Sequence, residues 1–198
     1  MQTARPAPTR RGQERREQIL ASAARLVASH GFHAVGVSEI GAAAGVSGAA
    51  LYRHFSNKSE ILVALLDRVV DHLLEGAAAA SEGDDPAAVL STLIAAHVDF
   101  AIKEKAILAV YAQEAHNLPA VDRTRLRRKQ RCYVDIWSDV YRLLHPASSE
   151  KAARAVVEAV FGMLNSVPNI SPDVGDELIR RELGRLARTA LLSGAGPV

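Results

Sequence analysis

The stretch VSEIGAAAGVSGAALYRHFSNKSEIL, residues 37–62, contains two short helical segments separated by a tight turn. The segments span about residues 37–44 and 48–55, and the turn between them begins at Gly45. Glycine tolerates the positive φ that such a turn requires, and Ser47 is a residue type that caps the helix following it. This spacing predicts a helix-turn-helix, whose second helix offers its exposed face to the major groove of DNA.

Helical periodicity continues on both sides of this stretch. Apolar residues recur on one helical face from Gln13 until Gly31 ends the segment near His30. Asn57, with Glu60 three residues later, predicts the capped start of a fourth helix. Residues 76–86 are expected to be a fraying helix end and a loop, followed by five helices over about 86–103, 105–117, 119–144, 148–166 and 173–192. Because no segment alternates as a strand does, the sequence predicts an all-α protein.

Composition and charge narrow the class of protein. Of the 198 residues, 48% are hydrophobic and 23% charged, which is typical of a soluble globular protein. Cys132 is the single cysteine, so an internal disulfide is excluded; with no secretory signal and no long apolar run, we expect a cytoplasmic protein. Residues 1–58 carry eight Lys and Arg against three Glu, a net +5, which leaves −3 for the remainder. The net positive charge of this N-terminal segment favours a polyanionic partner.

The motif residues identify a family. An Ile-x-x-x-Ala-Gly-Val-Ser stretch from Ile40, then Leu-Tyr-x-His-Phe from Leu51, then Lys58 resemble the DNA-binding domain of TetR-family regulators over about residues 13–62. The resemblance implies a nine-helix, all-α regulator with a three-helix DNA-binding domain. It divides the chain into a disordered basic arm (1–12), the helix-turn-helix domain (13–58) and an effector-binding and dimerisation domain (59–198).

The same resemblance implies which residues meet DNA. Tyr52, His54 and Lys58 match positions where the family contacts phosphates. The full candidate set is Arg10, Arg11, Ser38, Ser47, Gly48, Ala50, Tyr52, Arg53, His54 and Lys58. Gly36, Ser38 and Ala49 depart from the family's usual Thr, Arg, and Gly or Pro, which leaves few long side chains to read bases. We therefore hypothesise that Arg53, the arm (Arg10, Arg11, Arg15 and Arg16) and DNA shape carry the specificity. The arm either enters the minor groove or makes non-specific phosphate contacts.

The resemblance also implies a homodimer on double-stranded palindromic operator DNA, formed by the last two helices. Two apolar stripes permit this: Ala152, Ala155, Val156, Ala159, Val160, Met163 and Leu164 in one helix, and Leu178, Ile179, Leu183, Leu186 and Ala190 in the other. An ordinary intramolecular core is the alternative interpretation.

The middle helices are expected to enclose an effector. The candidate residues are His97, Phe100, Tyr111, Glu114, Asn117, Arg128, Tyr133, Trp137 and Phe161, each a type that also occurs in plain cores. Residues 123–131 hold six cations within nine positions of one helix. They form either a solvated basic face or a clamp for an anionic effector such as the phosphates of coenzyme A.

A shorter similarity suggests the effector class. Tyr111–Ala115, followed by Arg128–Arg131 and Val134-Asp135, are similar to TetR-family members that sense acyl-CoA thioesters in fatty-acid or sterol catabolism. We expect a repressor released by a small molecule; alternatives are a regulator of efflux or other catabolism that responds to an uncharged hydrophobic ligand, or an activator. No phosphate loop, nucleophile elbow or zinc motif is present, so neither an enzyme nor a cofactor or metal site is expected. Cys132 is expected to be a buried, inert thiol.

Overall fold

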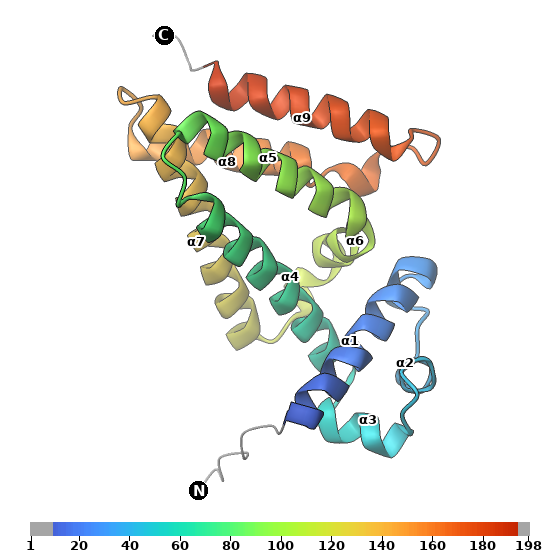
Figure 1. The fold of residues 1–198 in the computed structure, drawn as a ribbon. Coiled ribbons are helices and arrows are strands. Elements are labelled where there is room, and N and C mark those ends of the chain that lie inside the picture. Colours follow the sequence, from blue (N-terminus) through green and yellow to red (C-terminus); the bar gives the residue numbers. More distant parts are fainter. Residues whose placement is uncertain (1–9, 194–198) are drawn as a thin grey trace, which may run out of the picture. The chain divides into compact units, whose positions relative to one another are not determined.

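The structure, a computed structural model, describes residues 10–193 apart from the side chain of Asn117. Within these residues it contains no strand, and its elements are helical throughout (Figure 1). The α-helices are α1 (Arg10–His30), α2 (Val37–Ala43), α3 (Gly48–His54), α4 (Lys58–Ala80), α5 (Pro86–Lys103), α6 (Lys105–Glu114), α7 (Ala120–Leu144), α8 (Glu150–Leu164) and α9 (Asp176–Leu192). Two short 3-10 helices, η1 (Ala115–Asn117) and η2 (Val167–Asn169), follow α6 and α8. The predicted nine-helix, all-α fold is confirmed.

The expected start of the first helix was wrong. Helix α1 begins at Arg10, so residues 10–12, expected in the disordered arm, are helical, whereas residues 1–9 lie outside the described residues. Helix α4 ends at Ala80, within the segment 76–86 that was expected to contain a helix end and a loop. Alanine, which fills positions 77–80, is the residue type with the highest helix propensity. The chain divides into two compact units between Leu65 and Leu66, a few residues beyond the expected boundary at 58/59.

The N-terminal unit is built around the predicted turn. Gly45 has φ of +64°, and the Ala50 amide donates to the Ser47 hydroxyl at 3.2 Å, which caps α3 as expected. Ile40, Leu51 and Phe55 are at most 1% exposed and form the centre of this small core. The core therefore fixes the position of α3, and the face of α3 that points away from the core stays in solvent.

The start of α4 follows the predicted capping pattern. The Glu60 amide donates to the Asn57 side-chain oxygen at 2.9 Å. In return, the Glu60 carboxylate accepts hydrogen bonds from the amide and hydroxyl of Ser56, at 2.6 and 2.8 Å. These reciprocal bonds satisfy amides that a helix N-terminus leaves unpaired.

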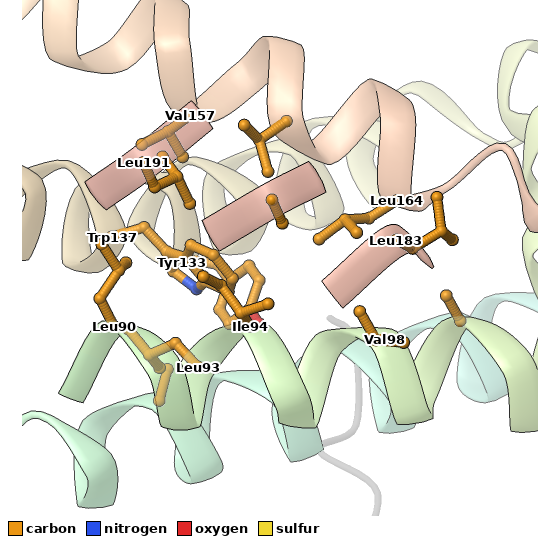
Figure 2. Close-up of a cluster of buried hydrophobic side chains, with 14 of the residues drawn as sticks. Leu90, Leu93, Ile94, Val98, Tyr133, Trp137, Val157, Leu164, Leu183 and Leu191 are labelled. Atoms are coloured by element: carbon orange, nitrogen blue, oxygen red, sulfur yellow. The ribbon is translucent and has the colours of Figure 1, made fainter. Parts of the chain in front are cut away.

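The C-terminal unit has a core shared by α5, α7, α8 and α9. Figure 2 shows Leu90 and Ile94 of α5 pointing toward Trp137 of α7, with Val157 of α8 and Leu191 of α9 on the opposite side. All five are buried. Helix α5 is long and apolar enough to cross a membrane, but half of it is buried against its neighbours, as in the core helix of a soluble protein.

Candidate functional site

The recognition helix and α1 form a basic concave surface in the N-terminal unit. This hollow, of about 420 Å³, is lined by Arg11, Gly12, Arg15, Gly45, Val46, Ser47, Ala50, Arg53 and His54. It brings together five of the ten residues expected at DNA, from elements far apart in the sequence. Arginines at the start of α1 and near the end of α3 give the hollow a positive charge, and phosphate oxygens are the matching ligands.

The remaining candidates border this surface or lie apart from it. Tyr52 is 56% exposed on α3, and Gly48 is exposed at the start of the same helix. Ser38 is exposed on α2, and Arg10 is exposed and paired with Glu14 at 3.3 Å. Of these, Tyr52 has the reach and amphipathic ring for a phosphate contact.

Two cations of the N-terminal unit have structural contacts. The Arg16 guanidinium donates to the His54 carbonyl at 3.2 Å and lies 4.1 Å from the centre of the Phe55 ring, so it fastens α1 to the end of α3. The Lys58 ammonium donates to the His33 carbonyl at 3.3 Å and sits 4.4 Å from the Phe32 ring. Lys58 is half-buried, held at the first position of α4 where the helix dipole also favours an anion.

The C-terminal unit encloses a cavity of about 400 Å³. Its apolar wall comes from α4 to α8: Leu66, Val69, Val70, Leu73, Phe100, Ile107, Leu108, Val134 and Phe161. Polar side chains complete the lining. The uncharged ones are His97, Tyr111, Gln130, Tyr133 and Asn165, and the charged ones are Arg127, Arg131 and Glu158. The three charged residues are exposed, so they mark where the cavity meets solvent.

A hydrogen-bonded network crosses the inner wall of the cavity. His97 Nδ1 lies 3.2 Å from the Tyr133 hydroxyl, and its Nε2 lies 3.1 Å from the Asn165 side-chain oxygen. Because that amide oxygen only accepts, Nε2 carries the proton and donates, while Nδ1 accepts from Tyr133. Burial lowers the pKa of His97 to about 4, so the ring is neutral. Burial also raises the pKa of Tyr133.

The cations of residues 123–131 all lie on α7, and they contact different partners. Arg125 and Lys129 point to α4, where both bond to Asp67, at 2.5 and 2.9 Å, and Lys129 also bonds to Asp71. Burial would raise the pKa of Asp67, but the hydrogen bonds and charges of Arg125 and Lys129 outweigh it and lower that pKa. Arg123 donates to the carbonyls of His116 and Leu118.

Arg127 and Arg131 occupy the face of α7 between these contacts. They are one helical turn apart and both line the cavity. In the described part of the chain, no carboxylate lies within ion-pair distance of either guanidinium, although Glu158 lines the same opening. A smaller hollow of about 200 Å³, lined in part by His116, Arg123 and Arg127, adjoins the cavity through the shared Tyr111 and Arg127. The opening therefore combines an apolar interior with a cationic rim.

Two family models match this chain, one in each of its two units. Residues 19–65 match the family described as bacterial regulatory proteins, tetR family, and residues 83–169 match a tetracyclin repressor-like C-terminal domain. Together the two matches cover more than half of the chain. The chain belongs to the TetR family. It is therefore a helix-turn-helix, DNA-binding transcriptional regulator, as the residues of the turn had predicted.

Two relatives and one solved structure are similar to this TetR-family regulator. Over 63 residues, 32% of this chain and 29% of the relative, it is 48% identical to the HTH-type transcriptional activator FasR of Mycolicibacterium smegmatis. Over 128 residues, 64% of this chain and 63% of the relative, it is 29% identical to the transcriptional repressor KstR2 of Rhodococcus jostii. Both alignments thus span less than two thirds of the relative. The structure of AibR in complex with isovaleryl coenzyme A and operator DNA has a TM-score of 0.70 at 22% identity, covering 87% and 97% of the two chains.

The effector residues expected in this TetR-family regulator divide into two groups. Five of them line the cavity: His97, Phe100, Tyr111, Tyr133 and Phe161. Trp137 is fully buried behind the lining, Glu114 is buried outside it, and Arg128 is exposed on another face of α7. The side chain of Asn117 lies outside the described part of the structure.

Sequence reasoning also missed residues at the TetR-family cavity. Gln130, Asn165 and the α4 residues of the lining were not among the candidates, and Arg128 was chosen where Arg127 and Arg131 line the opening. The 3.6-residue helical period separates Arg128 from those two, but the sequence does not say which face of α7 meets the cavity. The expectation that Cys132 is buried was wrong, because its thiol is exposed.

Proposed function

We propose that this regulator is a homodimeric repressor that binds a palindromic operator in the cytoplasm and releases it when an acyl-CoA occupies the C-terminal cavity. The observation that carries the effector proposal is the cationic rim of Arg127 and Arg131 on an otherwise apolar cavity. An acyl-CoA has the matching parts, an apolar chain and a phosphorylated head group. The acyl-CoA named in the AibR structure supports the same class.

In this proposal the acyl chain enters the cavity and the head group stays at the rim. Arg127 and Arg131 present planar, fixed donors that suit phosphate oxygens, and the adjoining hollow adds Arg123 and His116. The ion pairs of Arg125 and Lys129 with α4 hold this part of α7 in place while its other face binds the ligand. Glu158 at the rim would oppose phosphate at very close range, so the proposal places the phosphates on the α7 side.

Removing the two rim arginines tests this assignment. The R127A/R131A variant is expected to bind dodecanoyl-CoA about 100-fold more weakly, because two charge-assisted hydrogen bonds of roughly 1.4 kcal/mol each are lost. Isothermal titration measures the affinity. Arg128→Ala is the matched control: it removes an exposed arginine of the same helix that lies off the cavity, and its affinity should equal that of the wild type.

The results separate the acyl-CoA proposal from its alternative. Equal affinities in R127A/R131A and the control would show that the rim does not hold the head group. Binding of uncharged hydrophobic ligands by the wild type, with no binding of acyl-CoA, would instead favour a regulator of efflux or other catabolism. The apolar lining of the cavity is the observation that favours this second function, because it suits an uncharged hydrophobic ligand.

For DNA, we propose that the basic hollow receives the phosphate backbone and that Arg53 reads a base. Arg11 and Arg15 of α1 and Ser47 of α3 line the hollow, while Arg53 is exposed on α3. Tyr52, His54 and Lys58 complete the phosphate contacts, as the family resemblance implies. The helical start of α1 at Arg10 favours phosphate contacts for Arg10 and Arg11, since their backbone is not an extended arm.

Replacing Arg53 separates base contacts from phosphate contacts. The Arg53→Ala variant is expected to bind its operator about tenfold more weakly and to lose preference over a scrambled duplex, because an arginine–guanine contact contributes about 1–3 kcal/mol. Fluorescence anisotropy at one fixed salt concentration measures both affinities. Arg15→Ala is the comparison, and it should weaken both duplexes equally. If Arg53→Ala also weakens both equally, Arg53 contacts a phosphate.

The dimer is proposed to form through α8 and α9. Ile179 and Leu183 of the expected stripes pack into the chain's own core, but Leu178 and Leu186 are 43% and 41% exposed. Ala152, Ala155 and Ala159 are exposed on α8 and permit close approach of a second helix. Light scattering tests the proposal: a mass equal to the single-chain 21.2 kDa at micromolar concentration would contradict it.

Whether the regulator represses or activates transcription needs its own experiment, because FasR is named an activator and KstR2 a repressor. Transcription in vitro with and without the regulator tests the proposed repression.

A further inference from the structure

A second cavity shares part of its lining with the effector cavity. It measures about 290 Å³ and lies between α4 and α5. Its lining consists of His72, Leu73, Gly76, Ala77, Leu93, Ala96, Asp99, Phe100, Lys103, Glu104 and Tyr133. Leu73, Phe100 and Tyr133 line both cavities, so these three side chains form the partition between them.

The second cavity has an apolar interior and a polar edge. Ala77 and Leu93 are at most 2% exposed, and Phe100 is 8% exposed. His72, Asp99, Lys103 and Glu104 of the lining are all at least partly exposed, so they lie at the opening to solvent. Such a lining suits an apolar chain and offers no built site for a charged group.

Gly76 has no evident structural reason to be glycine. It lies within α4, where glycine costs roughly 0.5–1 kcal/mol relative to alanine. Its φ is not positive, and a Cβ atom built on it would meet no atom within 4 Å. Neither backbone strain nor close packing therefore requires it. It is exposed and lines the second cavity, so a larger side chain at this position would stand at the cavity's opening.

We propose that the second cavity is the distal part of the effector site and receives the end of a long acyl chain. This inference rests on the proposed function, since it extends the chain that enters between Arg127 and Arg131. The chain passes Leu73 and Phe100, whose side chains rotate aside, and continues between α4 and α5. The regulator consequently prefers long acyl chains to short ones, because only long chains gain the apolar surface of the second cavity.

A variant that obstructs the second cavity tests this inference. In G76L/A96L, two leucines are added at exposed positions of its lining that are absent from the first cavity's lining, where their side chains can fold over the opening. The control is A79L/A95L, which adds the same side chains to the same two helices at exposed positions outside both linings. Isothermal titration measures the affinities of saturated acyl-CoAs from six to eighteen carbons for the wild type and both variants.

Each buried methylene raises affinity about fourfold until the site is full. We expect the wild type and the control to gain affinity up to long chains, while G76L/A96L stops gaining several methylenes earlier and keeps its affinity for short chains. If affinity stops rising at the same acyl-chain length in all three proteins, the inference is overturned and the proposed function stays intact.

The n-alkanol series tests the cavity without the head group. If alkanols show the earlier break in G76L/A96L but no acyl-CoA binds the wild type, the second cavity stands and the acyl-CoA proposal falls. If neither series binds the wild type, both proposals fail.

Discussion

A Trp137→Ala variant is expected to lose about 3–5 kcal/mol of unfolding free energy, the usual cost of removing a large aromatic side chain from a packed core. The indole of Trp137 is 0% exposed. It contacts His97 and Phe161 edge-on, with ring centroids 5.8 and 4.9 Å away, and lies among side chains of α5, α8 and α9 (Figure 2). Because these helices close around it from several sides, they cannot collapse far into the space left behind.

Urea denaturation followed by far-ultraviolet circular dichroism measures the loss. Trp137→Phe is the informative partner variant. Trp137 Nε1 is buried and, in the described part of the chain, has no partner at full hydrogen-bond geometry; its nearest polar interaction is a weak one with the Tyr133 hydroxyl, so phenylalanine removes a poorly satisfied donor along with part of the ring. The Phe variant should therefore lose much less than the Ala variant. A loss below about 1 kcal/mol for Trp137→Ala would mean that this core is loosely packed.

Lowering the pH from 7 to 4 is expected to cost the protein about 3 kcal/mol through His97 alone. The folded pKa of His97 is about 4 and the ordinary value is 6.5, so between these values the unfolded chain binds a proton that the folded chain does not. Unfolding is then favoured progressively as the pH falls through this window, and each pKa unit contributes 1.36 kcal/mol. Below about pH 4 the folded state is protonated as well, and this loss stops growing.

The pH dependence can be isolated with a non-titrating variant. His97→Phe keeps an aromatic ring beside Phe161 but removes the proton site, so its unfolding free energy should fall less steeply between pH 6.5 and 4. Its absolute stability is lower, because the bonds to Tyr133 and Asn165 are lost. His30→Gln, at an exposed histidine of α1, controls for the loss of one histidine elsewhere. Parallel pH profiles for wild type and His97→Phe would contradict the prediction.

Local sequence signals predicted the DNA-binding half well. Gly45, Ser47 and Asn57 act through neighbours within four residues, and the structure has each of them in the expected turn or cap. Leu51 and Phe55, the apolar residues of the Leu-Tyr-x-His-Phe motif, are fully buried. The contact of Arg16 with His54 was missed, because it joins residues 38 positions apart.

The effector half was less predictable for the same physical reason. Helical periodicity shows that Arg127 and Arg131 share a face and that Arg125 and Lys129 share another. Only the packing of α4 against α7 decides that the second pair meets Asp67 and the first pair meets the cavity. The exposed Cys132 was predictable to some extent: its helical neighbours Arg128 and Asp135 are charged, and both are exposed.

The position of the single tryptophan has a practical consequence. The indole of Trp137 contacts His97, Tyr133 and Phe161, all three of which line the effector cavity. Its fluorescence thus reports on one defined place directly behind the cavity lining, without any label. A shift in emission maximum or intensity on adding an effector would report occupancy of the cavity, and the same signal would follow unfolding. Trp137 therefore allows the proposed binding of an effector to be followed without a label.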